Sequence, residues 1–198
     1  MSTEPRLAPL PADEWGDDEY DAYGALLGMP GERVPRAGSG HTFDPERFGV
    51  VSTMVRNPAL AKAFWAFSSY QMRAGSLPVR LRELAILRTA HQRQSAYEWG
   101  QHVKIALNSG ITEAEIDQLV HGNSGFGAAD RLVLEATDEL IGDGQIGDAT
   151  WLAIQAELDT AQVMDLVFVV GTYTTLAMAF ATWRLAPEPG SASVPARS

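Results

Sequence analysis

The stretch LPVRLRELAILRTAHQRQSAYEWGQHVKIALNSGITEAEIDQL, residues 77–119 of the 198-residue chain, decides the fold. Apolar residues recur three and four positions apart through it, a spacing that places them on one face of a helix. Pro78 favours a helix start, and Gly110 is a typical residue just past a helix end. Thr112 and Glu115 have the spacing of a capping box, which predicts another helix. The stretch therefore predicts three successive helices.

Helical patterns continue on both sides of this stretch. Asn57 and Pro58 form an N-cap and first-turn pair for a helix that runs to about Arg73. Further helices are expected over residues 13–27, 128–142 and 149–158. No segment of useful length alternates with a period of two residues, so the chain is expected to be all-α.

Three parts are expected along the chain. Residues 1–47 form an N-terminal extension, a short acidic helix followed by a loop rich in Gly and Pro over 28–47; a loop of that length is mobile or functional. Residues 48–186 form the helical domain. Residues 187–198, PEPGSASVPARS, are expected to be a disordered tail because of their composition.

The composition excludes several classes of chemistry. No cysteine is present, which excludes disulfides, thiolate metal sites and catalysis by a cysteine. Lys and Arg number 15 against 25 Asp and Glu, and the resulting net charge of −10 argues against binding to nucleic acid. The N-terminus has no signal-peptide pattern, so a cytoplasmic protein is expected.

One stretch has the length of a membrane span. Residues 166–183, LVFVVGTYTTLAMAFATW, carry no charge over 18 positions. Threonine, tyrosine and glycine residues dilute its apolar character, Asp165 precedes it, and no positive cluster flanks it. A buried helix, packed within the protein or in an oligomer, is the better interpretation, and no membrane partner is expected.

The densest group of chemically active side chains lies within residues 82–102. Ser95, Glu98 and His102 follow one another at intervals of three and four, which places them on one helix face. Glu83 lies one helix earlier and reaches this face if the two helices fold back on each other. A Glu–His pair is a plausible proton-transfer unit, because the carboxylate fixes the imidazole tautomer.

Structural interpretations compete for the same residues. Ser95 and Glu98 have the spacing of a capping box at the point where the helix should begin. His102 is also explained as a hydrogen-bonded histidine of an amphipathic helix. Three arginines of the preceding helix can bind a substrate carboxylate or pair with neighbouring acids. They are Arg80, Arg82 and Arg88.

These residues resemble the carboxymuconolactone decarboxylase family, which includes alkyl hydroperoxidase D. The resemblance covers residues 48–125 and rests on the pattern R-E-L-x-I-L-R, then Y-E-W-x-x-H, then G-I-T-x-x-E-I. It implies an all-helical bundle built around a helical hairpin. It also implies a homo-oligomer, a trimer or a hexamer.

The peroxidase branch of this family has Glu, eleven residues, Cys, two residues, Cys, three residues and His. The resemblance carries the two Cys positions to Ser95 and Glu98, and the outer positions to Glu83 and His102. The spacing is kept while both thiols are replaced. A hydroxyl cannot reduce a hydroperoxide through a sulfenate, and a carboxylate cannot resolve one, so the thiol peroxidase mechanism is excluded.

The decarboxylase branch implies a site without metal or organic cofactor, and none is expected. His102 is then the proton donor or electrophilic stabiliser, and Glu98 orients it or shares its proton. Glu83 is a more distant partner or the base that fixes His102, and Ser95 completes the catalytic set. Three further residues are expected to contact the substrate: Arg88, Tyr97 and Trp99.

The expected substrate is a small carboxylated or lactone molecule. Loss of CO₂ leaves electron density delocalised into a lactone carbonyl, so the site must hold that charge and deliver a proton to carbon. Two other interpretations stay open. One is a non-catalytic small-molecule or partner-binding protein on the same scaffold. The other keeps a redox role, through a partner thiol or through a divalent metal ion bound by His102, Glu98 and Glu83.

Overall fold

The computed structural model describes residues 4–197, and every regular element in that range is helical, which confirms the all-α prediction. The chain divides into two compact units. The first runs up to Gly75 and also includes Thr182–Glu188; the second is Ser76–Ala181 with the residues from Pro189 onward. This division differs from the expected boundary at 47–48, because the helix after that boundary packs with the N-terminal extension.

The first unit is built on the packing of α1 (Asp17–Leu27) against α3 (Pro58–Arg73). The rings of Tyr23 and Trp65 meet edge to face, with centroids 6.3 Å apart. The Asn57 side chain accepts a hydrogen bond from a backbone amide three residues on, which confirms the predicted cap. Its other elements are η1 (Ala12–Glu14), η2 (Gly31–Arg33), η3 (Pro45–Arg47) and α2 (Gly49–Met54).

The loop over residues 28–47 is organised by the buried carboxylate of Asp44. Its oxygens accept from the amides of Gly40 at 2.9 Å and Glu46 at 3.1 Å. Burial raises the pKa of Asp44, but these backbone donors together outweigh it and hold the pKa below its usual value. The loop is therefore tied to a charged carboxylate of its own.

The second unit contains the predicted hairpin. Helix α4 (Val79–Arg93) ends at Gln94, which has φ 52° and ψ 40°, and α5 (Ala96–Asn108) begins two residues later. The Ser95 amide donates to the Ala90 carbonyl at 2.9 Å, closing α4 in the manner of a Schellman motif. This tight reversal returns α5 against α4.

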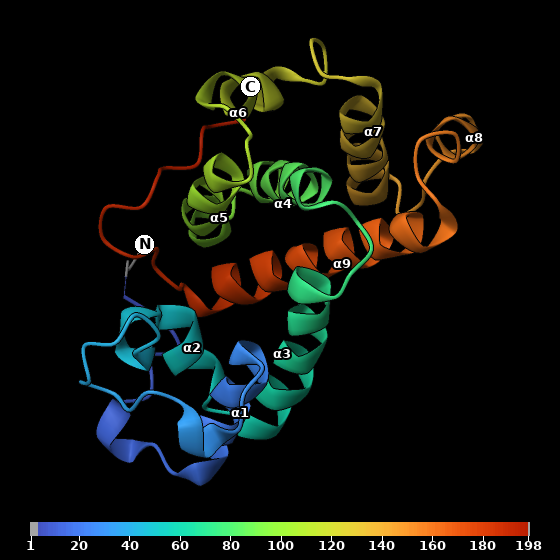
Figure 1. The fold of residues 1–198 in the computed structure, drawn as a ribbon. Helices are drawn as coiled ribbons and strands as arrows, with labels where there is room; N and C mark the ends of the chain where they lie inside the picture. Colours follow the sequence, from blue (N-terminus) through green and yellow to red (C-terminus); the bar gives the residue numbers. More distant parts are fainter. Residues whose placement is uncertain (1–3, 198) are drawn as a thin grey trace. The chain divides into compact units, whose positions relative to one another are not determined.

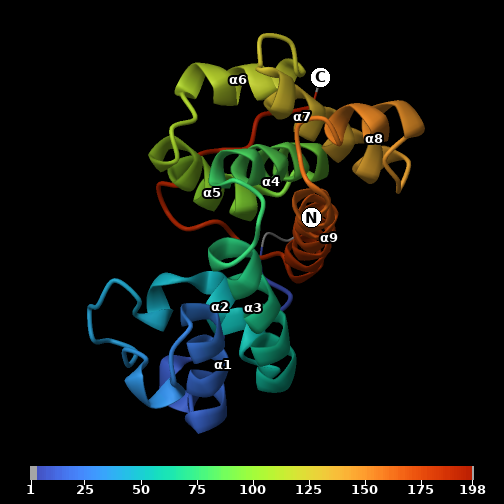
Figure 2. The same cartoon turned by 45° about the vertical axis from the view of Figure 1, so that its right-hand side comes forward.

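Four more helices complete the second unit. The capping box at the start of α6 has both of its predicted hydrogen bonds, with Thr112 and Glu115 as partners. Gln162 and Asp159 cap α9 reciprocally, each through a contact of 2.9 Å. Figures 1 and 2 both show α9 passing beside α4. The helices are α6 (Glu113–His121), α7 (Ala128–Gly142), α8 (Asp148–Ile154) and α9 (Thr160–Trp183).

Helix α9 passes the length and hydropathy test for a membrane span. It has 24 residues, and its most apolar window has a mean hydropathy of 1.7. Half of that window is buried inside the protein, where Leu166, Val169 and Val170 join the apolar core. The core helix of a soluble protein passes the same test, so the result is weak support for a membrane span.

The C-terminal tail follows a defined course along the second unit. The Gln94 side chain donates to the Pro195 carbonyl at 2.9 Å, and Val194 packs against the core. At Gly100 of α5 a Cβ atom would lie 2.7 Å from the Cβ of Ser191, so only glycine admits the tail this closely. The tail expected to be disordered therefore has partners, which its composition did not reveal.

Candidate functional site

The hairpin brings Glu83 of α4 and His102 of α5 into direct contact. The Glu83 Oε2 atom lies 2.6 Å from His102 Nδ1, and neither side chain is exposed. Because a carboxylate only accepts hydrogen bonds, Nδ1 carries the proton. Of the two roles expected for Glu83, the geometry matches that of the base which fixes His102.

Arg82 holds the other oxygen of Glu83. Its Nε and Nη2 atoms both donate to Glu83 Oε1 at 3.1 Å, and both side chains are buried. The ion pair balances the carboxylate charge inside the protein, where an unpaired charge would be costly. Arg82 therefore positions Glu83, and its guanidinium is engaged rather than open to a substrate carboxylate.

His102 has a second partner, Tyr173, which lies on α9 and is distant in the sequence. The hydroxyl of Tyr173 lies 2.9 Å from His102 Nε2, and the two rings are perpendicular with centroids 4.9 Å apart. Tyr173 was not among the site residues predicted from the sequence. The available signal was a tyrosine in an uncharged stretch, because a buried phenol requires a hydrogen-bond partner.

Glu98 lies one turn before His102 on the same helix and is 2% exposed. Neither of its carboxyl oxygens has a hydrogen-bond partner. Burial raises the pKa of Glu98 to about 8, and the nearby Ser95 hydroxyl opposes the shift without reaching hydrogen-bond geometry. The expected Glu98–His102 pair is not formed, because both imidazole nitrogens bind other partners.

The capping-box interpretation of Ser95 and Glu98 is wrong. Ser95 occupies the N-cap position, but its hydroxyl makes no capping bond and is buried without a partner. Its amide is already used by the Ala90 carbonyl in closing α4, so Glu98 has no donor to reach back to. At the two positions to which the resemblance carries the thiols of the peroxidase branch, both side chains thus carry buried polar atoms without hydrogen bonds.

Arg88, expected to bind substrate, is engaged with the protein itself. Its Nε and Nη2 atoms contact the two carboxylate oxygens of Asp138 at 2.6 and 2.7 Å, and Nη1 donates to the Leu119 carbonyl. Arg80 likewise pairs with Asp130, at 2.8 Å, and with Glu115. Both arginines therefore link α4 to the surrounding helices.

Tyr97 and Trp99, also expected to contact substrate, are buried in the second unit. The Tyr97 ring packs edge to face against Phe180 with centroids 5.1 Å apart. Trp99 belongs to the apolar core and lies beside the ring of His91, 6.2 Å between centroids. Both side chains therefore contribute to packing in this structure.

The metal interpretation finds no support in the donor set. Among residues 4–197, no group of three or more His, Cys, Asp or Glu side chains is arranged to hold a metal ion. The acid–base cluster consists of Arg82, Glu83, His102 and Tyr173. Within it, Arg82 and His102 each contact one oxygen of Glu83, and Tyr173 contacts the second nitrogen of His102.

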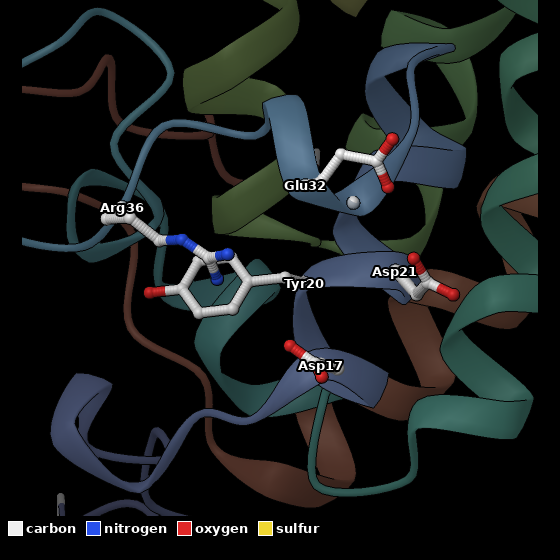
Figure 3. Close-up of a pocket in the computed structure, with 6 residues that line it drawn as sticks. Asp17, Tyr20, Asp21, Glu32 and Arg36 are labelled. Atoms are coloured by element: carbon white, nitrogen blue, oxygen red, sulfur yellow. The ribbon is translucent and has the colours of Figure 1, made fainter.

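A separate, polar pocket lies in the first unit, as Figure 3 shows. Its volume is about 270 Å³. The guanidinium of Arg36 stacks on the Tyr20 ring, 3.9 Å from the centroid, among three carboxylates. Its lining residues are Asp17, Tyr20, Asp21, Gly31, Glu32 and Arg36. None of them was predicted as a site residue.

The second unit thus has an all-helical fold around a buried acid–base cluster without thiols. Residues 58–139 match the model of the carboxymuconolactone decarboxylase family. No curated protein matches the chain. The expected resemblance to this family is therefore confirmed over residues 58–139.

Two solved structures share the fold. One is a protein of unknown function from Agrobacterium tumefaciens, described as a putative antioxidant defence protein AhpD; it is 18% identical, with a TM-score of 0.62 over 71% of this chain and 97% of that one. The other is an uncharacterized peroxidase-related protein from Ralstonia eutropha with an alkylhydroperoxidase AhpD core, 17% identical, with a TM-score of 0.69 over 92% of this chain and 93% of that one. At these identities the likeness establishes the fold alone.

Proposed function

We propose that this protein is a cofactor-free acid–base lyase that acts on a small carboxylated or lactone substrate. One observation carries the proposal: the buried Glu83–His102 hydrogen bond lies one helical turn from Glu98, a buried carboxyl group without partners. Two titratable groups in such different environments take opposite roles in proton transfer. The absence of cysteine leaves these groups as the reactive side chains of the hairpin.

The proposed roles divide between Glu98 and His102. With a pKa of about 8, Glu98 keeps its proton at neutral pH and is the acid. When the bond from carbon to the substrate carboxylate breaks, CO₂ leaves and the electron pair moves into the conjugated carbonyl. Glu98 then gives its proton to carbon and is left as a carboxylate. His102, oriented by Glu83, accepts a proton from solvent and passes it to Glu98, so both groups return to their starting state and one solvent proton is consumed for each CO₂ released.

The test is to offer the protein a panel of unsaturated γ-lactone carboxylates. Turnover is measured as CO₂ release and as deuterium incorporation at carbon in heavy water. We expect Glu98→Gln and His102→Ala to lower kcat by about 10²- to 10⁴-fold, the usual contribution of a general acid or base. Lys104→Gln, an exposed change on the same helix, is the control and should keep full activity. Unchanged turnover in both site variants would overturn the assignment.

A second function is a small-molecule or partner-binding protein without catalysis. The burial of Tyr97 and Trp99 favours it, because these side chains fill space next to the cluster's helix instead of lining an opening. A thermal-shift screen with lactones and aromatic acids separates the two functions. Stabilisation of the protein without conversion of any stabilising ligand supports the binding protein.

A further inference from the structure

Tyr173 contacts the ring nitrogen of His102 that is not bonded to Glu83. Its hydroxyl lies 2.9 Å from Nε2, and both side chains are buried. Tyr173 lies outside residues 58–139, the segment that matches the family model, so the family match says nothing about it. The contact is made because α9 passes beside the hairpin within the second unit.

The partners of His102 determine which nitrogen carries the proton. Glu83 accepts at Nδ1, so a neutral imidazole must have its hydrogen there and a lone pair at Nε2. The phenol is then the donor to Nε2. Burial raises the pKa of Tyr173 well above its usual value, and the carboxyl groups of Glu83 and Glu98 raise it further, so the phenol keeps its proton.

We propose that Tyr173 is a positioning residue that holds His102 in the Nδ1–H tautomer, with Nε2 as a hydrogen-bond acceptor. The imidazole is thereby fixed as a proton acceptor at Nε2, and the donor role falls to another group. This inference rests on the proposed function for the use of that acceptor, whereas the tautomer is a property of the resting protein and is measured without substrate.

The experiment is ¹⁵N NMR of the full chain with labelled histidine side chains, recorded where His102 is neutral. His102→Gln assigns the resonances among the four histidines. In the wild type we expect a protonated Nδ1 and an unprotonated, hydrogen-bonded Nε2. In Tyr173→Phe the Nε2 resonance should move to that of a free acceptor, and the Nε2–H tautomer should become more populated by roughly fivefold, the effect of one hydrogen bond.

Tyr23→Phe is the matched control. It removes another buried tyrosine hydroxyl, one that donates to the Phe43 carbonyl at 3.1 Å in the first unit, and it should leave the His102 resonances unchanged. A wild-type protein in the Nε2–H tautomer would overturn the proposal, as would identical His102 spectra in wild type and Tyr173→Phe. If Tyr173→Phe does not fold, the wild-type tautomer alone decides. Loss of the proposed enzyme activity in other tests would not alter these spectra.

Discussion

Ser95 and Glu98 stand at the two positions to which the family resemblance carries the thiols of the peroxidase branch. Both are buried, and the reactive atoms of both lack hydrogen-bond partners. A buried polar group without a partner costs on the order of 1–3 kcal/mol of stability. Glu98 escapes the larger cost of a buried charge by keeping its proton at neutral pH.

The raised pKa of Glu98 makes a prediction about stability and pH. Its ordinary value is 4.5 and its value in the fold is about 8, so between these pH values the native state binds the additional proton. The free energy of unfolding therefore falls as the pH rises from about 4.5 to about 8. Glu98→Gln has no carboxyl group to ionise, so its free energy of unfolding should not show this fall. Its stability relative to the wild type should therefore rise across that pH range, by at most about 1.4 kcal/mol per unit of pKa shift.

Urea denaturation at pH 4 to 9 measures this difference. Glu113→Gln, which changes an exposed glutamate on α6, is the control and should follow the wild-type pH dependence. Parallel curves for wild type and Glu98→Gln would show that Glu98 ionises in the native state as it does in the unfolded chain. That result would also remove the acid from the proposed mechanism.

The sequence predicted which residues form the cluster but not how they pair. The helical spacing of Ser95, Glu98 and His102 placed them on one face; in the structure Glu98 and His102 lie on α5, Ser95 is its N-cap residue, and all three are buried. It could not decide between Glu83 and Glu98 as the partner of His102, because that depends on how α4 and α5 fold back. Nothing local identified Tyr173, which reaches His102 across 71 positions of sequence.

Helix α5 carries different features on opposite faces. Glu98 and His102 face the cluster, while Gly100, two residues from each, points about 200° away and meets the C-terminal tail. The absence of a side chain at Gly100 allows Ser191 to approach. The same helix therefore positions the site and holds the tail.

Two glycine substitutions test whether the close approach of the tail depends on Gly100. Gly100→Ala should displace the tail, because its Cβ atom would meet Ser191 at 2.7 Å, and amide hydrogen exchange in residues 189–197 should accelerate. Gly171→Ala on α9 meets no atom within 4 Å and should stabilise the protein by about 0.5–1 kcal/mol through helix propensity. Equal tail exchange in the two variants would contradict the close approach at Gly100.

At the scale of the whole molecule, α9 combines buried and exposed apolar residues. Leu166 and Val170 lie in the core, whereas Met164 is 57% exposed and Val167 is 39% exposed. Exposed apolar side chains in close succession are typical of a surface that contacts another protein. The family resemblance implies a homo-oligomer, a trimer or a hexamer, and this surface is where we expect its subunits to meet.

Light scattering of the purified chain measures its oligomeric state. We expect a mass of three or six times 21.4 kDa. Val167→Lys should shift the mass toward that of the monomer, because a charge would have to be buried at the interface. Lys104→Gln changes an exposed residue elsewhere and should leave the mass unchanged. A wild-type protein that is strictly monomeric would contradict the expectation.

By itself the sequence determined the helices, most of their caps and the absence of thiol chemistry, because helical periodicity, capping and composition are local properties. Only the tertiary structure decided that Glu83, not Glu98, binds His102, that Tyr173 completes the group, and that Arg88 pairs with Asp138. It also decided that the tail packs against α5. These outcomes depend on which helix faces meet, and packing between distant segments sets that geometry.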